Sequence, residues 1–162
     1  MVIGINDQFV ADVVDSVYSS VTEQLTGIQL KHPPTRKRRI ENPVSVVVLS
    51  KGVFKSKAVV QFPAEFVEAV VDKMSNGAEL SKEDREAYFK EYMNIFYGRF
   101  ISKINNEIGR ASRFIIPVIL RGTYRETAES DYSNRVVVSF MSDQGKIEFV
   151  LCYEVLPEHS SN

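Results

Sequence analysis

Apolar residues recur about every four positions in the first part of the chain, which is the spacing of an amphipathic helix. The positions are Ile5, Phe9, Val13, Val17, Val21 and Leu25. Asn6 or Asp7 can cap the start of this helix, and Gly27 stands where a left-handed stop belongs. The pattern predicts a helix of about five turns with one face in the core.

Two strand-like runs follow, over residues 44–50 and 54–62, and the Lys51-Gly52 pair between them predicts a β-hairpin. Pro63 is expected to begin a helix at its first position, and Asn76-Gly77 to end it. The apolar stripe of that helix comprises Phe66, Val67, Val70, Val71 and Met74.

Residues 82–110 predict a long helix, with Ser81 as its N-cap. At 1.5 Å per residue it would span about 43 Å. Its apolar stripe is formed by Phe89, Met93, Phe96, Phe100 and Ile104. Nearly opposite that stripe lie Glu91, Asn94 and Gly98, together with Ala87, Ser102 and Asn105. The outer face of this helix therefore presents a carboxylate and an amide flanked by small side chains.

The last part of the chain predicts three strands, over residues 114–123, 135–141 and 146–155. Pro117 lies inside the first of them and indicates an edge or a bulge, because proline has no N–H. Residues 124–133 are polar and predict a mobile loop, and residues 142–145 predict a hairpin turn.

The predicted order is α-ββ-αα-βββ, which favours an α+β fold: a mainly antiparallel sheet with long helices packed on one face. The length of 162 residues suits one domain, expected over residues 1–157, with a frayed tail at 158–162.

Composition excludes several classes of function. The formal net charge is −1, so global charge favours neither nucleic acid nor membrane as a partner. The longest apolar run, residues 114–120, is far too short to span a bilayer. Cys152 is the single cysteine, no secretory signal is recognisable at the first residues, and a cytoplasmic protein is expected.

Residues for metal or covalent chemistry are scarce. With His32, His159 and Cys152 as the whole set of histidines and cysteines, no zinc-type cluster is possible. Phosphate-loop, dinucleotide and nucleophile-elbow motifs are absent from the sequence. Cys152 falls mid-strand and is interpreted as a small buried hydrophobe. We therefore predict no metal and no cofactor.

A basic run of Arg36, Lys37, Arg38 and Arg39 has two interpretations. It could contact phosphate, in which case nucleic-acid binding would depend strongly on salt. It could instead be a solvated loop or an edge strand that its charge keeps from aggregating. The second is favoured, because no aromatic residues are interleaved with the run.

Glu91 and Asn94 permit chemistry of one kind. An amide can donate and accept hydrogen bonds and so orient a water, while a carboxylate can pair with a cation or act as a base. Gly98 inside the helix costs about 1 kcal/mol relative to Ala, and close approach of another backbone is the usual reason for such a glycine. The simpler interpretation is a solvated face whose polar residues have no special role.

Glu91-Tyr-Met-Asn94, the 22 residues after Asn94 and then Pro117 resemble the motif of the CheC/CheX family of chemotaxis phosphatases, [Asp/Ser]-x3-Glu-x2-Asn-x22-Pro. The similarity extends over about residues 4–155. Other similar segments are the Ile5-Asn6 helix ending Leu25-Thr26-Gly27-Ile28, the strand ending Val59-Val60-Gln61-Phe62-Pro63, and Asn94-Ile-Phe-Tyr-Gly98. The chain looks closest to CheX, which carries one such motif, because its first helix has Asp12-Val-Val-Asp15 and no second Glu-x2-Asn.

The resemblance implies a two-component signalling enzyme that removes phosphate from the phospho-aspartate of a CheY-type receiver. Asn94 would orient the attacking water, and Glu91 would pair with the receiver's active-site lysine, with a general-base role as second choice. Ala87, Lys90, Gly98 and Ser102 would contact the receiver, which would hold the Mg²⁺. The resemblance also implies a homodimer joined through sheet edges.

The sequence departs from that motif at its first position, where Ala87 replaces Asp or Ser. This departure keeps open an alternative, a catalytically weak module that binds receivers without hydrolysis. Tyr97 and Arg99, on either side of Gly98, are expected to tune the partner surface.

Overall fold

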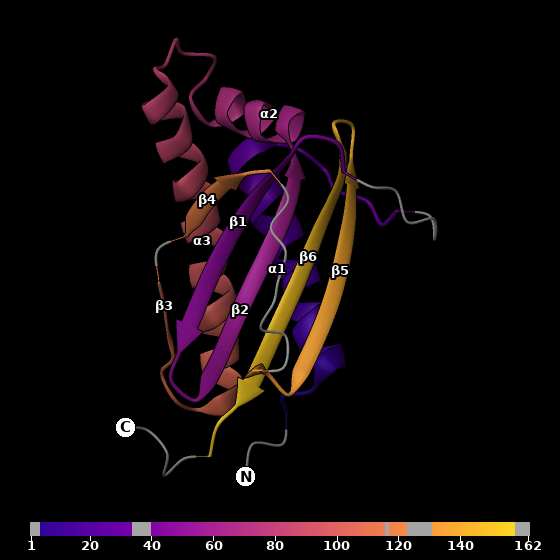
Figure 1. Ribbon diagram of the computed structural model, residues 1–162, viewed down its shortest axis with the longest axis vertical. Helices are drawn as coiled ribbons and strands as arrows, with labels where there is room; N and C mark the ends of the chain where they lie inside the picture. Colours follow the sequence, from indigo (N-terminus) through magenta and orange to yellow (C-terminus); the bar gives the residue numbers. More distant parts are fainter. Residues whose placement is uncertain (1–3, 34–39, 116, 123–130, 158–162) are drawn as a thin grey trace.

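The computed structural model describes residues 4–33, 40–115, 117–122 and 131–157 (Figure 1). Along the chain the elements are α1 (Asp7–Thr26), β1 (Pro43–Lys51), β2 (Phe54–Pro63), α2 (Ala64–Met74), α3 (Lys82–Ile108), β3 (Arg113–Phe114), β4 (Val118–Arg121), β5 (Asn134–Ser142) and β6 (Gly145–Val155). The basic run 36–39, residues 124–130 of the expected loop and the tail 158–162 lie outside the described residues.

The strands form one sheet in the order β3-β1-β2-β6-β5, and β4 pairs with β1 at another position along the same edge as β3. Every pairing is antiparallel, and the hairpins β1–β2 and β5–β6 are in register over most of their length. Helices α1 and α3 cover one face of the sheet, while α2 lies across one end (Figure 1). The expected α+β architecture is confirmed.

The ends of α1 follow from its terminal residues. Asn6 has an extended backbone, and its side-chain oxygen accepts a hydrogen bond from the Phe9 N–H at 2.8 Å. Gly27 takes the left-handed conformation, with φ of 75°, and donates its N–H to the Glu23 carbonyl. Both ends match the expected cap and stop, because each satisfies backbone groups that the helix leaves without intrahelical partners.

Pro117 lies at the sheet edge, as its missing N–H predicts, whereas Pro63 acts differently from the sequence prediction. The strand expected at residues 114–123 divides into β3, which ends at Phe114, and β4, which begins at Val118. Pro117 cannot donate to a ladder, so the strand breaks there instead of running on. Pro63 ends β2 and occupies the N-cap of α2, with ψ of 141°, rather than the first helical position.

The core lies between the helices and the covered face of the sheet and is rich in aromatic side chains. Those almost fully buried are Tyr18, Tyr92, Tyr97, Tyr153, Phe54, Phe62, Phe66, Phe89, Phe96, Phe100, Phe140 and Phe149. Tyr18 packs edge-on against Phe96 at 5.1 Å and Phe149 at 4.8 Å between ring centroids, which joins α1, α3 and β6. Cys152 is 4% exposed in β6, as expected of a buried small residue. None of the described helices is long and apolar enough to cross a membrane.

Buried tyrosines make the fold sensitive to alkaline pH. Burial raises the pKa of Tyr18, Tyr92 and Tyr97 above the ordinary value of tyrosine. Above about pH 10 the unfolded chain releases these protons while the folded chain keeps them, so the free energy of unfolding falls as pH rises. Each tyrosine contributes up to about 1.4 kcal/mol per pH unit. Urea unfolding between pH 8 and 12 should show this fall; a flat profile in that window would contradict it.

Candidate functional site

Helix α3 is built as the sequence predicts. Ser81 accepts a hydrogen bond from the Asp84 N–H at 3.1 Å, and Gly109 ends the helix with φ of 77°. The apolar stripe faces the core, and Phe89, Met93, Phe96, Phe100 and Ile104 are at most 1% exposed. On the outer side Ala87, Glu91 and Ser102 are exposed, while Asn94 and Gly98 are partly exposed.

Two buried tyrosines fix how α3 is rotated about its axis. The Tyr92 hydroxyl lies 2.7 Å from the Thr22 hydroxyl, which ties α3 to α1. The Tyr97 hydroxyl lies 2.7 Å from that of Ser56, and Ser56 in turn bonds Ser50, which ties α3 to the β1–β2 hairpin. Tyr92 and Tyr97 flank Asn94 in sequence, so a rotation that buried Asn94 would break both contacts.

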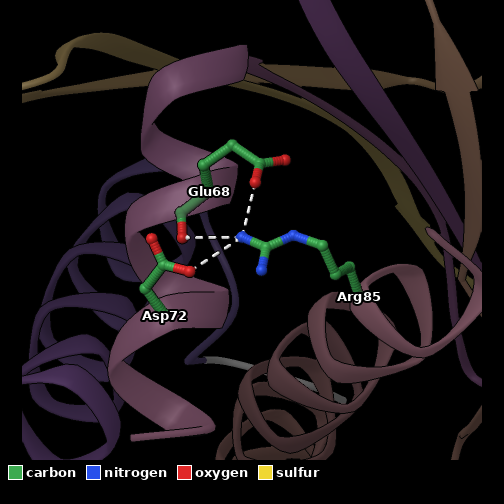
Figure 2. Close-up of polar contacts among 3 residues, drawn as sticks. All are labelled: Glu68, Asp72 and Arg85. Carbon is green, nitrogen blue, oxygen red and sulfur yellow. Dashed lines mark hydrogen bonds and ion pairs between the residues drawn. The ribbon is translucent and has the colours of Figure 1, made fainter. Parts of the chain in front are cut away.

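Arg85 fixes the N-terminal part of α3 against α2. Its guanidinium donates to the Asp72 carboxylate at 2.9 Å and to both the carboxylate and the backbone carbonyl of Glu68 (Figure 2). The carboxylates are more than half exposed, so we assign this cluster a positioning role rather than a large share of the stability. The N-terminal part of α3 is thereby fixed against α2, and the candidate site residues follow it along the same helix.

The side chains of Glu91 and Asn94 have no partner among the residues that the structure describes. They lie three positions apart on the outer side of α3, so their side chains share a face. Neither side chain forms a hydrogen bond or ion pair with the residues that the structure describes. Both are therefore available to a partner.

The remaining predicted contact residues sit around that pair. Lys90 lies one turn before Asn94, and its Nζ is 4.0 Å from the Glu86 carboxylate, a weak contact that a partner could replace. Ala87 lies one turn before Glu91 and is exposed. Gly98 and Ser102 follow Asn94 on successive turns.

Two residues assigned to the outer face have other roles. Asn105 accepts a hydrogen bond from the Ser112 N–H at 2.8 Å and donates to the Ser112 carbonyl at 3.2 Å, so it holds the turn into β3. Tyr97 is 1% exposed and cannot tune a partner surface. At about 100° per residue Tyr97 lies about 60° from the centre of the apolar stripe and so at its border. Asn105 does lie on the outer side, but it is close to the end of α3, where the chain returns beside it at Ser112.

Gly98 has no close backbone neighbour inside the described chain. A Cβ at this position would meet the Phe114 ring at 3.8 Å, which is ordinary van der Waals contact. The short strands β3 and β4 pack against α3 here without demanding a glycine. The reason for the glycine therefore does not lie in packing among the described residues.

Gly98→Ala is expected to raise the free energy of unfolding by about 0.5–1 kcal/mol, because Ala favours the helix more than Gly does. Urea unfolding of the variant beside the wild type measures this. A destabilised variant would mean that α3 has less room beside Phe114 than the geometry indicates. If the variant gains stability and loses binding to a partner, the glycine serves that partner.

The structure also brings together residues that sequence reasoning did not connect. Arg99 and Lys103 of α3 face α1 across a groove, which neither helix shows alone. Their spacing of four positions was a signal that they share a face. The sequence alone did not place α1 opposite them.

The side chains of the site can form hydrogen bonds and ion pairs. Among the described residues no group of three or more His, Cys, Asp or Glu side chains is placed to hold a metal ion. The site comprises an exposed carboxylate and a partly exposed amide that share one face of α3. The class of protein is thus an α+β domain that presents a Glu–Asn helix face.

Chemotaxis proteins are among the solved structures to which this fold is similar. A CheX protein from Desulfovibrio desulfuricans is 20% identical, with a TM-score of 0.71 over 90% of this chain and 99% of that chain. A CheC-like superfamily protein from a Shewanella species is 17% identical, with a TM-score of 0.73 over 93% of this chain and 99% of that chain. In a Borrelia burgdorferi CheX–CheY–BeF₃–Mg²⁺ complex the match is 18% identical, with a TM-score of 0.62 over 88% and 96% of the two chains.

No protein-family model matches the sequence, and no curated protein matches it. At these identities the structural likeness establishes the fold and not the activity. The chain has the CheX and CheC-like fold over most of its length, and the fold expected from the Glu91–Asn94 motif is confirmed.

Proposed function

We propose that this protein is an aspartyl-phosphate phosphatase that acts on a phosphorylated CheY-type receiver domain. The observation that carries the proposal is the position of Glu91, which is exposed, and Asn94, which is partly exposed, on one face of α3 without a partner among the described residues. The fold adds support, because the CheX of the Borrelia burgdorferi complex shares it and is bound there to CheY with BeF₃ and Mg²⁺.

In the proposed reaction the outer face of α3 docks on the receiver's phosphorylation site. The Asn94 amide holds a water in line with the phosphorus–oxygen bond of the acyl phosphate. The water oxygen attacks phosphorus, and the bond to the aspartate oxygen breaks. The products are the aspartate carboxylate and inorganic phosphate, which keeps one water proton while the other passes to solvent. Positioning is the main requirement, because transfer of a phosphoryl group to water needs little covalent help from the protein.

Glu91 is proposed to pair with the active-site lysine of the receiver, which anchors the complex and aligns the water. The helix already fixes the Glu91 backbone, so only the rotamers of its side chain have to be ordered when the pair forms. The Mg²⁺ belongs to the receiver in this proposal, and our chain supplies no metal ligand. Ala87, Lys90, Gly98 and Ser102 form the surrounding contact surface.

The decisive experiment is the decay of a phosphorylated CheY-type receiver with and without catalytic amounts of this protein. Acceleration that scales with enzyme concentration and continues over many turnovers would support the proposal. Several receivers should be tried, because the helix face does not specify which one is served. Absence of acceleration with every receiver that binds would overturn the phosphatase function.

A catalytically weak binding module is the second candidate function, and Ala87 is the observation that favours it. The side chain one turn before Glu91 cannot form a hydrogen bond, whereas the related motif has Asp or Ser there. If the module is weak for this reason, Ala87→Ser should increase receiver dephosphorylation severalfold, because the exposed position accepts a hydroxyl without repacking. If the wild type already dephosphorylates the receiver quickly and Ala87→Ser is no faster, the protein is not a catalytically weak binding module.

We further propose a homodimer joined through sheet edges. In the described chain β4 pairs only with β1 and carries Val118 and Leu120, which are 53% and 39% exposed. An edge with exposed apolar side chains invites pairing with a second copy. Sedimentation velocity over a range of concentrations measures the state, and a monomer at every concentration would refute the dimer.

A further inference from the structure

Helices α1 and α3 enclose a groove of about 490 Å³ that the proposed reaction does not use. Val17 and Val21 of α1 line it, and both are buried, so its base is apolar. Ser102, Arg99 and Lys103 line it from α3. The groove thus combines an apolar base with hydroxyl and cationic side chains along its sides.

The charge of the groove has one sign. Arg99 and Lys103 are its only charged lining residues among those described, and both are cations. Arg99 donates one N–H to the Gln24 side chain, which orients the guanidinium and leaves its other donors available. Lys103 forms no ion pair with any residue that the structure describes. The groove therefore favours an anionic group that can accept several hydrogen bonds.

The groove lies close to the proposed docking site. Arg99 is five and Lys103 nine positions after Asn94, which corresponds to about 7.5 and 13.5 Å along the helix axis. An ordinary protein interface buries about 800 Å² per partner, equivalent to a disc of about 16 Å radius. At about 100° per residue Arg99 and Lys103 lie about 140° and 180° around the helix from Asn94, on its α1 side, whereas Ser102 lies about 20° from Glu91. A receiver that covers Glu91 and Ser102 therefore borders the groove. Ser102 belongs to both the predicted contact surface and the groove lining.

We propose that the α1–α3 groove receives a carboxylate-bearing segment of the receiver surface, next to the receiver's phosphorylation site. Arg99 and Lys103 pair with its carboxylates and steer the receiver onto Asn94. The inference rests on the proposed function, since it concerns the same partner. Nucleic acid is a poorer occupant, because no aromatic side chain lines the groove for base stacking and the whole chain has a net charge of −1.

The steering role predicts an effect on association and not on the chemical step. In the double variant Arg99→Glu and Lys103→Glu, the Kd for a beryllofluoride-activated receiver should rise about tenfold, mainly through a slower on-rate. The turnover number at saturating phosphorylated receiver should stay within twofold of the wild type. Added NaCl should slow association of the wild type more than that of the variant, because screening weakens long-range attraction.

The matched control is a double variant with the same change in net charge at two lysines outside the groove. Lys51 ends β1 and Lys73 lies in the last turn of α2, and both are exposed and outside the groove. The double variant Lys51→Glu and Lys73→Glu should leave the Kd within about twofold of the wild type. An equal loss in both double variants would mean that net charge alone is responsible, and would overturn the groove proposal.

The test separates this inference from the proposed function. If the wild type accelerates dephosphorylation but the groove variant binds receiver as tightly, the groove inference fails and the phosphatase function stands. If no receiver is dephosphorylated but the groove variant loses affinity and the control does not, the phosphatase function fails and the groove remains a receiver contact. Circular dichroism and urea unfolding of each variant confirm that α1 and α3 remain folded.

Discussion

Asn94→Ala is expected to slow receiver dephosphorylation by about 100-fold, or ~2.7 kcal/mol of barrier. The truncation removes the only amide on the Glu91–Gly98 segment of the outer face, so the attacking water loses the group that orients it. Stability should not fall, because Asn94 forms no hydrogen bond with the described residues and Ala favours a helix. The measurement is the turnover number at saturating phosphorylated receiver.

The affinity of the Asn94→Ala protein gives the control. Its Kd for a beryllofluoride-activated receiver should change by less than about threefold if the amide acts on the water and not on docking. Asn94→Gln keeps the amide but moves it outward by one methylene, so partial activity is expected. Full activity of Asn94→Ala would refute the water-positioning role, whatever the affinity.

Glu91→Ala is expected to weaken docking as well as turnover. Loss of a close charge pair across an interface costs at least about 1.5 kcal/mol, or roughly tenfold in Kd. Glu91→Gln keeps the shape and removes the charge, so it should lose nearly as much affinity. Titration calorimetry with the activated receiver measures the Kd, and steady-state decay measures the turnover number.

Glu83→Ala supplies the matched control for Glu91. Glu83 lies two turns earlier, in the first turn of α3, and its side chain is also exposed. Its removal should leave receiver affinity unchanged. If Glu91→Ala lowers turnover but leaves affinity intact, the carboxylate acts as a base or holds the water, and the pairing with a receiver lysine is wrong.

Patterns of apolar residues were sufficient to predict most of the fold. The first helix begins after Asn6 and ends at Gly27 as expected, since capping is a local interaction between neighbouring residues. Both hairpins follow from alternation with a turn between the strands. Pro117 indicated a bulge or an edge. The division of the expected strand into β3 and β4 also depended on how each part pairs with β1, and this pairing joins residues far apart in the sequence.

Parts of the site were predictable for the same reason. Glu91 and Asn94 share a face because the helical repeat is a property of the backbone, and the structure places both on the outer side of α3. Tyr97 was misplaced because it lies at the border of the apolar stripe, and Asn105, although on the outer side, is engaged by the turn that follows α3. Their surroundings, Ser56 for the tyrosine and Ser112 for the amide, come from other elements.

The sequence by itself determined the helices, most strands, the antiparallel hairpins and the Glu91–Asn94 spacing, because these depend on contacts within a few residues. Only the tertiary structure decided that α1 lies beside α3, and that Tyr92 and Tyr97 fix the rotation of α3 about its axis. It also decided that Arg99 and Lys103 border a groove. These features join residues far apart in the sequence, such as Thr22 and Tyr92, which are 70 positions apart. Such contacts form only when burial of the shared aromatic core brings distant elements together.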